Sequence, residues 1–286
     1  MTSAELFKLG YDCGNALIYD EMVKYYKMAI DMNHVEAMFR LAYYYDKADN
    51  KTEMIKYYKI AISHGHSSAM FNLAYHYDKL VMAVDEKPAG TLDLVAYNDR
   101  ANNEIEMLKY YKMGAEHGSA NSMINIAIYY RDIKNFDEMK KYYFMAAKLG
   151  DAQSMSGLAS YFKQIKDYDN MMKYYLMAID RGHINAMYNL GIYYRDQSDY
   201  ENMIKYFVMA VEHGNYDGLS NIYAHYTHKS QHIELFAILL RFYRRDTKNI
   251  AIRDYLRALL KCDKVADIFI TGHIKLLDTV DAKTKL

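Results

Sequence analysis

A Lys-Tyr pair recurs six times along the chain at nearly constant spacing, and this spacing constrains the fold more than any other feature. The pairs begin at Lys24, Lys56, Lys109, Lys141, Lys173 and Lys205. Four of the five intervals are 32 residues long, and the remaining interval of 53 exceeds that period by 21 residues. A fixed period of this length is typical of a solenoid, in which each repeat is one supersecondary unit that packs on its neighbours. The longer interval predicts an insertion within one repeat.

Small and apolar residues recur at fixed distances after each Lys, which are called positions +1, +2 and so on. Position +13 is always small: Ala37, Ala69, Ser122, Ser154, Ala186 and Gly218. Position +17 is always Leu or Ile: Leu41, Leu73, Ile126, Leu158, Leu190 and Ile222. Position +18 is small in five copies, and position +21 is Tyr or Phe in all six. Spacings of three and four residues keep side chains on one face of an α-helix, so these positions predict an amphipathic helix.

The punctuation between these positions predicts two helices in each repeat. Position +9 is Gly in five copies and Asn33 in the first, as expected for the left-handed residue that ends a helix. The following residue is a good N-cap in three copies: Ser119, Asp151 and Asn215. Four residues before the Lys, other residues are expected to cap the second helix: Asp20, Thr52, Asp137 and Asp169. Each repeat is therefore predicted to be an antiparallel pair of helices of about three turns.

The stretch Met177–Tyr194 resembles the core of a Sel1-like repeat, a relative of the tetratricopeptide repeat. The matching residues are Ala178, Gly182, Ala186, Leu190, Gly191 and Tyr194. The resemblance covers about residues 4–228 and recurs in every copy. Two features depart from the family: the loop between paired helices is shorter than usual, and Tyr or Phe replaces its frequent Trp. The resemblance implies a superhelical array that acts as a scaffold or adaptor, without catalysis.

We expect an all-α, right-handed superhelical solenoid of about seven antiparallel helix pairs with a helical C-terminal cap. The array is expected over residues 1–228, and the insertion over about 80–102 is expected to form a helical hairpin with its turn near Pro88–Thr91. Residues 229–286 are expected to cap the stack. Their predicted helices cover Ile233–Arg244, 249–262 and 264–277.

Composition and charge narrow the class of partner. The chain has 36 basic and 36 acidic residues, so its formal net charge is zero, which counts against nucleic acid or an anionic membrane as the partner. No apolar run approaches the ~20 residues of a membrane span. The N-terminus lacks a signal-peptide pattern, so we expect a cytoplasmic location. The 32 Tyr and absent Trp fit an AT-rich genome. Proteins with Sel1-like repeats occur in bacteria, in amoebae and in large DNA viruses of amoebae, so one interpretation is a viral source. A viral chain would be expected in the cytoplasm of the host cell.

Motifs that carry chemistry are missing from the sequence. It has no Gly-rich phosphate loop, no HExxH, no CxxC and no GxSxG, so we expect neither an enzyme nor a bound cofactor. His34, His66 and His183 fall at the helix-cap position between repeats. The residues His64, His117 and His213 fall in the last turn of a helix, where a partial positive charge is favourable. No metal site is therefore predicted, since structural zinc needs four converging ligands.

The candidate binding surface is the first helix of each pair, because the resemblance implies that these helices line a concave groove. Position +16 is Asn in four copies: Asn72, Asn125, Asn189 and Asn221. An Asn amide is both donor and acceptor, so this ladder is expected to hold a peptide backbone. Position +19 adds Tyr43 and Tyr75. The alternative is that each Asn bonds a neighbouring repeat or water.

The side-chain charge at position +22 changes sign along the chain. It is negative at Asp46 and Asp78 and positive in the next three copies: Arg131, Lys163 and Arg195. The basic residues favour an acidic partner segment over the second half of the surface. The alternative is a favourable placement of cations near a helix C-terminus.

The pattern as a whole predicts a non-catalytic protein-interaction scaffold or adaptor that binds a peptide or protein segment. The apolar insertion at about 80–102 is expected either to fold against the groove or to offer an apolar surface to a partner or to a second copy of the chain. One alternative is a substrate adaptor for a ubiquitin or degradation machinery, as in some members of the family. Another is a nucleic-acid-binding helical repeat, which would need a basic groove.

Overall fold

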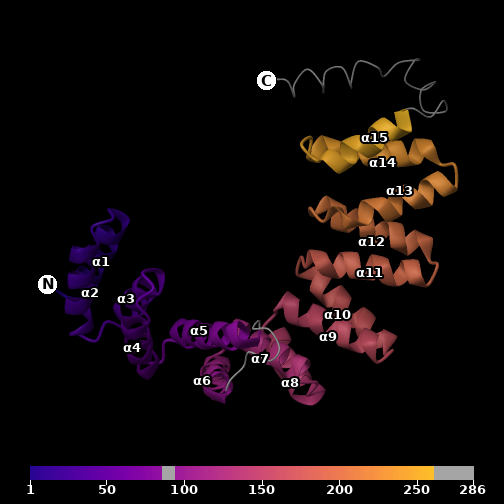
Figure 1. Ribbon diagram of the computed structural model, residues 1–286. Coiled ribbons are helices and arrows are strands. Elements are labelled where there is room, and N and C mark those ends of the chain that lie inside the picture. Colours follow the sequence, from indigo (N-terminus) through magenta and orange to yellow (C-terminus); the bar gives the residue numbers. More distant parts are fainter. Residues whose placement is uncertain (86–93, 261–286) are drawn as a thin grey trace. The chain divides into compact units, whose positions relative to one another are not determined.

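The computed structural model describes residues 1–85 and 94–260, and these residues form helices joined by short turns (Figure 1). The α-helices are α1 (Ser3–Asn15), α2 (Tyr19–Ile30), α3 (Val35–Lys47), α4 (Lys51–Ser63), α5 (Ser67–Asp85), α6 (Leu94–Glu116), α7 (Ala120–Asp132), α8 (Phe136–Lys148), α9 (Ala152–Gln164), α10 (Tyr168–Asp180), α11 (Ile184–Asp196), α12 (Tyr200–Glu212), α13 (Leu219–His228), α14 (His232–Arg245) and α15 (Ile250–Leu260). A short 3₁₀ helix, η1 (Tyr216–Gly218), precedes α13. The described ranges contain no strand. The chain divides within α9 into two units, Met1–Ser154 and Met155–Leu286.

The helices alternate between two kinds, which confirms the predicted all-α repeat solenoid. The A helices carry the small and apolar positions +13 to +21, and they are α3, α5, α7, α9, α11 and α13. The B helices carry the Lys-Tyr pair, and they are α2, α4, α6, α8, α10 and α12. Within each unit, successive helices pack against one another, as in the pairs α3 with α4 and α11 with α12. Helices α3 and α4 are each 13 residues long, which matches the expected length.

Both turns of the repeat pass through left-handed backbone. The predicted turn after each B helix is confirmed, with φ between 77° and 96° at Gly65, Gly118, Gly150, Gly182 and Gly214 and with φ of 59° at Asn33. A second column, which the sequence analysis missed, lies in the turn after the A helices, with φ between 53° and 61° at Leu17, Asp49, Lys134, Lys166, Ser198 and Ser230. These residues vary in type and include no Gly, so composition alone carries no signal for this turn.

The caps expected for the B helices were wrong by two residues. The residues Asp20, Thr52, Asp137 and Asp169 lie inside the first turn. The N-caps of four B helices instead lie six residues before the Lys, where a side-chain oxygen accepts from the backbone N–H three residues on: Asn50, Asn135, Asp167 and Asp199. Caps of the A helices were correct where Ser119 Oγ accepts from the Ser122 N–H at 3.2 Å and His34 Nδ1 accepts from the Ala37 N–H at 3.2 Å, whereas Asn215 caps the 3₁₀ helix η1 ahead of α13.

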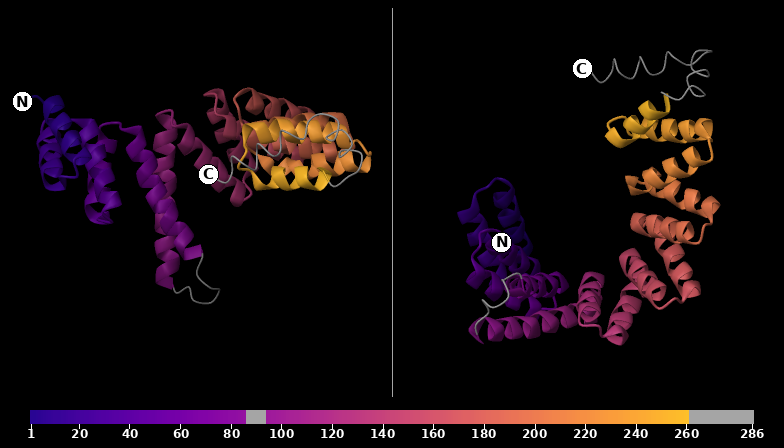
Figure 2. Two further views of the ribbon diagram at one scale, coloured as in Figure 1. Left: turned by 90° about the horizontal axis from the view of Figure 1, so that it is seen from above. Right: turned by 45° about the vertical axis from the view of Figure 1, so that its right-hand side comes forward.

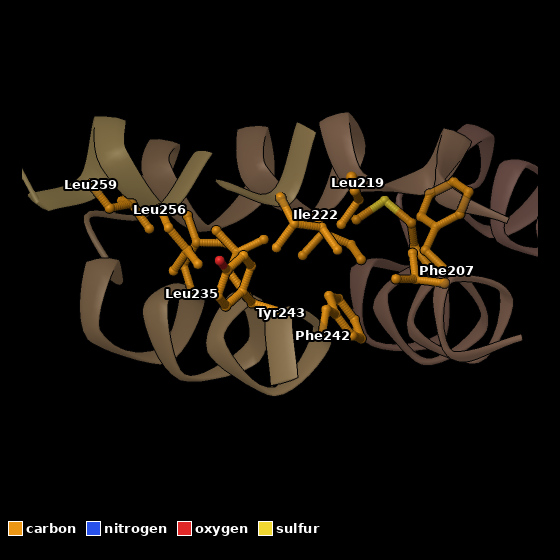
Figure 3. Packing of buried hydrophobic residues seen from close by; sticks show 12 residues of the cluster. Phe207, Leu219, Ile222, Leu235, Phe242, Tyr243, Leu256 and Leu259 are labelled. Carbon is orange, nitrogen blue, oxygen red and sulfur yellow. The ribbon is translucent and has the colours of Figure 1, made fainter. Parts of the chain in front are cut away.

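Small residues and methionines build the core between helices. Position +18 is fully buried at Ala42, Ala74, Ala127 and Ala159. At the equivalent Gly191, an added Cβ would lie 2.7 Å from the ring of Phe207, so the helices there approach too closely for a side chain. Position −2 is a buried Met in six copies: Met22, Met54, Met107, Met139, Met171 and Met203. In the second unit, Phe207, Leu219 and Ile222 pack with Leu235 and Phe242 in one cluster (Figure 3).

The Lys-Tyr pair that reveals the period forms a repeated contact at the edge of each helix pair. The ring at +1 stacks on the ring at +21 of the preceding A helix in five copies, with centroids 5.5–6.1 Å apart. Each Lys Nζ lies 4.9–5.7 Å from the centroid of the Tyr beside it. Four of these Lys also pair with a Glu three residues earlier, at 3.0–3.2 Å. Stacking and cation–π attraction therefore give the signature a structural role.

The insertion lengthens both helices of one pair. Helix α5 has 19 residues and α6 has 23, and the two run side by side beyond the ends of their neighbours (Figure 2). These two helices agree with the arms of the expected helical hairpin, and its predicted turn near Pro88–Thr91 lies outside the described residues. At its base, Arg100 pairs with Glu104 at 2.8 Å, and the Tyr129 hydroxyl of α7 donates to the same carboxylate.

The C-terminal region begins as expected. Helix α14 corresponds to the helix predicted over Ile233–Arg244, and α15 corresponds to the one predicted over 249–262. The ends of both helices differ from the predicted ends by one or two residues. The third predicted helix, over 264–277, lies outside the described residues. Helix α14 contributes Leu239 and Tyr243 to the buried cluster of the second unit, so it continues the stack without the Lys-Tyr signature.

Candidate functional site

The Asn ladder of position +16 lies where A helices meet the preceding B helix. Asn72 Nδ2 donates to the Tyr58 hydroxyl at 3.1 Å, and Asn125 Nδ2 donates to the Tyr111 hydroxyl at 2.7 Å. Both rings are buried. In the first unit, therefore, the amide donor of each Asn joins two successive repeats.

The second unit contains one Asn that follows this rule and one that does not. Burial raises the pKa of Tyr175, and hydrogen bonds with Ser160 and Asn189 oppose that shift. Asn221 follows Phe207, which has no hydroxyl, and its Oδ1 instead accepts from Arg195 Nη1 at 3.3 Å. These contacts are what the alternative interpretation of the ladder predicted, and contact with a peptide stays a prediction.

The tyrosines of position +19 are exposed on the A helices. Tyr43 is 41% exposed and Tyr75 is 45% exposed. Lys47 Nζ lies 5.1 Å from the Tyr43 centroid, and Lys79 Nζ lies 4.5 Å from the Tyr75 centroid. Each of these Tyr side chains offers an apolar ring and a polar hydroxyl with few rotatable bonds, and a Lys ammonium lies beside the ring.

The charged column of position +22 differs between its acidic and basic copies. Burial raises the pKa of Asp78, although a hydrogen bond from the Tyr111 hydroxyl at 3.3 Å opposes the shift. Arg131 and Arg195 are exposed, and each pairs with the Asp that follows it, at 2.9 Å and 3.0 Å. Lys163 is partly buried on α9. Asp78 is thus partly buried beside a Tyr hydroxyl, whereas Asp46 and the two Arg are exposed.

Three cavities occur at an equivalent place, between the first turn of a B helix and the position +20 to +24 region of the next A helix, whereas a fourth, of about 460 Å³, lies near Ile184 and His213 at the turn between α12 and η1. In the first unit, a cavity of about 550 Å³ is lined by Tyr11, Gly14, Asn15, Tyr19, Met22, Tyr26, Arg40, Tyr43, Tyr44, Lys47 and Ala48. A second, of about 290 Å³, is lined by Tyr45, Asp46, Asp49, Lys51, Met54, His76, Lys79 and Leu80. In the second unit, a cavity of about 420 Å³ is lined by Arg195, Tyr200, Met203, Asn221, Ala224, His225, His228 and Lys229.

These cavities are lined partly by site residues predicted from the sequence and partly by residues that were not predicted. Tyr43 lines the first cavity, and Arg195 and Asn221 line the third. The sequence analysis missed the residues at −5 and +20, whose rings meet across the seam: Tyr19 lies 5.5 Å from Tyr44, and Tyr200 lies 5.0 Å from His225. The signal was present, because position +20 is Tyr or His in every copy.

Six histidines cap a helix or bond to the end of one: His34, His64, His66, His117, His183 and His213. His66 and His183 accept at Nδ1 from the backbone of the next helix, at 3.2 Å and 3.1 Å. His117 Nδ1 lies 2.9 Å from the Met113 carbonyl oxygen. Across residues 1–85 and 94–260, no three His, Cys, Asp or Glu side chains are grouped so as to hold a metal ion. No helix in the same ranges is long and apolar enough to cross a membrane.

Comparison with known proteins agrees with this architecture. A family profile described as the tetratricopeptide repeat matches residues 184–212, which are α11 and α12. A search of curated proteins gives no match. The chain is therefore a helical-repeat protein similar to tetratricopeptide-repeat proteins, and the Sel1-like subtype stays a prediction.

Similar solved structures include three proteins of low identity. The immunity protein Pa5087 from Pseudomonas aeruginosa is 16% identical, with 69% of this chain and 75% of that chain covered and a TM-score of 0.40. The tetratricopeptide domain of P58(IPK) is 11% identical, with 92% and 79% covered and a TM-score of 0.30. Yeast Tom70 is 11% identical, with 91% and 72% covered and a TM-score of 0.24.

Proposed function

We propose that the chain is a non-catalytic, cytoplasmic protein-interaction scaffold that binds a peptide or protein segment along the exposed face of its A helices. The observation that carries this proposal is the recurrence of cavities of about 290–550 Å³ at the seams between repeats. Cavities of this size accept side chains or small ligands. The two cavities of the first unit lie in successive repeats, so they suit successive side chains of one extended partner.

Exposed aromatic residues support the same surface. Tyr43 and Tyr75 occupy equivalent positions on α3 and α5, within one unit. Tyrosine is enriched in protein interfaces because it buries a large ring at little cost in side-chain entropy. We include Asn72, Asn125, Asn189, Asn221, Arg131, Lys163 and Arg195 in the proposed surface. No specific contact favours a degradation adaptor or a nucleic-acid reader over a general scaffold.

The test is selection of binding peptides from a random display library on the purified chain. Tyr43→Ser and Tyr75→Ser are each expected to lower the affinity for the selected peptides by about tenfold, since an aromatic anchor contributes about 1–2 kcal/mol or more to the binding free energy. Both residues are exposed, so the fold should survive. Leu176→Ser is the matched control, because Leu176 is 39% exposed but lies on the B helix α10. Equal weakening by the control, or full affinity in both Tyr variants, would refute binding on the A helices.

A further inference from the structure

The cavity of the second unit combines an apolar floor with a basic rim. Met203 is buried beneath it, Ala224 lines it, and the Tyr200 ring lies 5.0 Å from the His225 ring in a tilted arrangement. The rim carries four basic side chains, Arg195, His225, His228 and Lys229. No carboxylate is among the residues that line it.

The rim charges are held toward the cavity by neighbouring groups. Arg195 Nη1 donates to Asn221 Oδ1 at 3.3 Å, which ties the guanidinium to the cavity wall. Arg195 also pairs with Asp196 at 3.0 Å, but both side chains are more than 40% exposed, so this pair competes only weakly with a ligand. Lys229 Nζ lies 5.8 Å from the Tyr200 centroid.

Four basic residues line this cavity, whereas two, Arg40 and Lys47, line the cavity of about 550 Å³ in the first unit. At position +20, four of the six copies carry Tyr and His76 occupies a fifth. At position +24, where Lys229 lies, the other copies carry Ala48, Leu80, Ile133, Ile165 and Gln197. The cavity lined by His76 also contains Asp46 and Asp49, so its charges are mixed. Neutral residues pack at positions +20 and +24 in most other copies, so packing at this seam does not require cations.

Placement near a helix end explains the cations only in part. His225 and His228 lie in the last turn of α13, where positive charge is favourable. Arg195 lies in the last turn of α11, where the same effect favours it, but it converges on this cavity from a second helix, which the helix-end effect does not explain. Burial, together with the charges of Lys229 and His228, lowers the pKa of His225, which indicates a positive local field.

We propose that this cavity binds the carboxylate side chain of an Asp or Glu in the partner segment, with Arg195 and Lys229 as its principal ligands. The inference rests on the proposed function and names one subsite of that surface. An entering carboxylate would accept from the Arg195 guanidinium and the Lys229 ammonium in a partly desolvated site, where charge-assisted hydrogen bonds are strong. The aliphatic stem of the same side chain would contact Met203, Ala224 and the Tyr200 ring.

The experiment compares fluorescein-labelled octaglutamate, octaglutamine and octalysine peptides by fluorescence polarisation on the full chain at low ionic strength. Octaglutamate is expected to bind, and octaglutamine at least about tenfold more weakly. Arg195→Gln and Lys229→Gln are each expected to weaken octaglutamate by about tenfold or more, with unchanged circular dichroism. Should one variant unfold, the other retains the test.

Arg181→Gln is the matched control, because Arg181 is an exposed Arg of the same unit at the end of α10 and does not line the cavity. It is expected to change octaglutamate affinity by less than about twofold. Equal binding of octaglutamate and octaglutamine would overturn the proposal. Equal weakening by Arg181→Gln would also overturn it, since the attraction would then be diffuse. If library peptides without acidic residues bind the chain, and Arg195→Gln leaves their affinity unchanged, the acidic subsite is refuted but the proposed function is not. If the library selection yields no binding peptide, the proposed function itself is refuted.

Discussion

At the scale of single residues, positions +2 and +16 behave as one hydrogen-bonded unit. Where the B helix carries Tyr58 or Tyr111, the next A helix carries an Asn that donates to the hydroxyl. Where the B helix carries Phe207, the Asn instead accepts from Arg195. A buried phenol needs a partner, because an unsatisfied hydroxyl in a core is costly. The Asn column is therefore a link between repeats, whatever further role it has toward a ligand.

Asn125→Ala is expected to lower the free energy of unfolding by about 1–2 kcal/mol, because it removes the amide donor to the buried Tyr111 hydroxyl. The measurement is urea denaturation followed by circular dichroism. A double-mutant cycle with Tyr111→Phe should show coupling between the two sites.

Asn221→Ala is the control for that experiment. Asn221 follows Phe207 and contacts Arg195 on the surface, so its loss is expected to change stability by less than about 0.5 kcal/mol. Equal losses at Asn125 and Asn221 would show that the phenol contact contributes nothing.

At the scale of elements, each repeat closes with two left-handed turns of different composition. The turn after a B helix uses Gly, such as Gly118 at φ 77°, whereas the turn after an A helix uses a side-chain-bearing residue, such as Lys134 at φ 59°. This conformation costs a residue with a Cβ roughly 1–2 kcal/mol, so the second turn is strained in the six copies in which the structure describes it.

Lys134→Gly is accordingly expected to stabilise the chain by up to about 1 kcal/mol, after the greater backbone entropy of Gly is subtracted. Gly118→Ala is expected to destabilise it by about 1–2 kcal/mol. Thermal denaturation measures both. Lys134→Ala keeps the same strain and should leave the midpoint nearly unchanged; a rise equal to that of Lys134→Gly would assign the effect to the lost charge.

The hairpin of α5 and α6 is the element that breaks the period. Met82 is 55% exposed and Ile105 is 63% exposed, so the pair presents apolar side chains to solvent. Deleting residues 81–101 restores the 32-residue spacing. The shortened chain is expected to fold, because the remaining repeat then has the geometry of its neighbours.

Light scattering and peptide binding decide what the hairpin does. We expect the deletion to remove self-association or to weaken partner binding, because insertions in repeat proteins often lie on the binding face. An unchanged molar mass together with unchanged peptide affinity would show that the hairpin serves neither purpose.

At the scale of the whole molecule, stability is expected to depend on pH through two histidines. Burial lowers the pKa of His76, with Asp46 opposing and Lys51 and Lys79 adding to the shift. Burial, Lys229 and His228 lower the pKa of His225. In both cases the unfolded chain takes up protons first, so the stabilisation is complete above about pH 6.5 and is lost as the pH falls through the folded-state pKa.

The thermal midpoint is therefore expected to fall between about pH 7.5 and pH 5.5, and His76→Gln with His225→Gln should reduce that fall. His64→Gln is the control, because His64 is an exposed residue at the end of α4. A pH dependence that survives the double substitution would place the responsible groups elsewhere.

The sequence by itself determined those features that depend on residues close together in the chain. The fully buried Ala74 and Ala159 were predicted because helical periodicity places +13, +17 and +18 on one face. The left-handed turns at Gly118 and Gly182 were predicted because Gly adopts positive φ without a steric penalty. The lengths of α5 and α6 followed from a break in the spacing.

Only the tertiary structure decided which side chains meet across helices. Periodicity placed Asn125 on a face but did not reveal that the Tyr111 hydroxyl lies 2.7 Å from its amide. The basic cavity joins Arg195, Tyr200 and Lys229, which come from different helices or helix ends. Such contacts depend on the rotation and distance between packed helices, which the core sets through many small contacts at once. Local patterns therefore specify the helices and turns, and packing specifies the site.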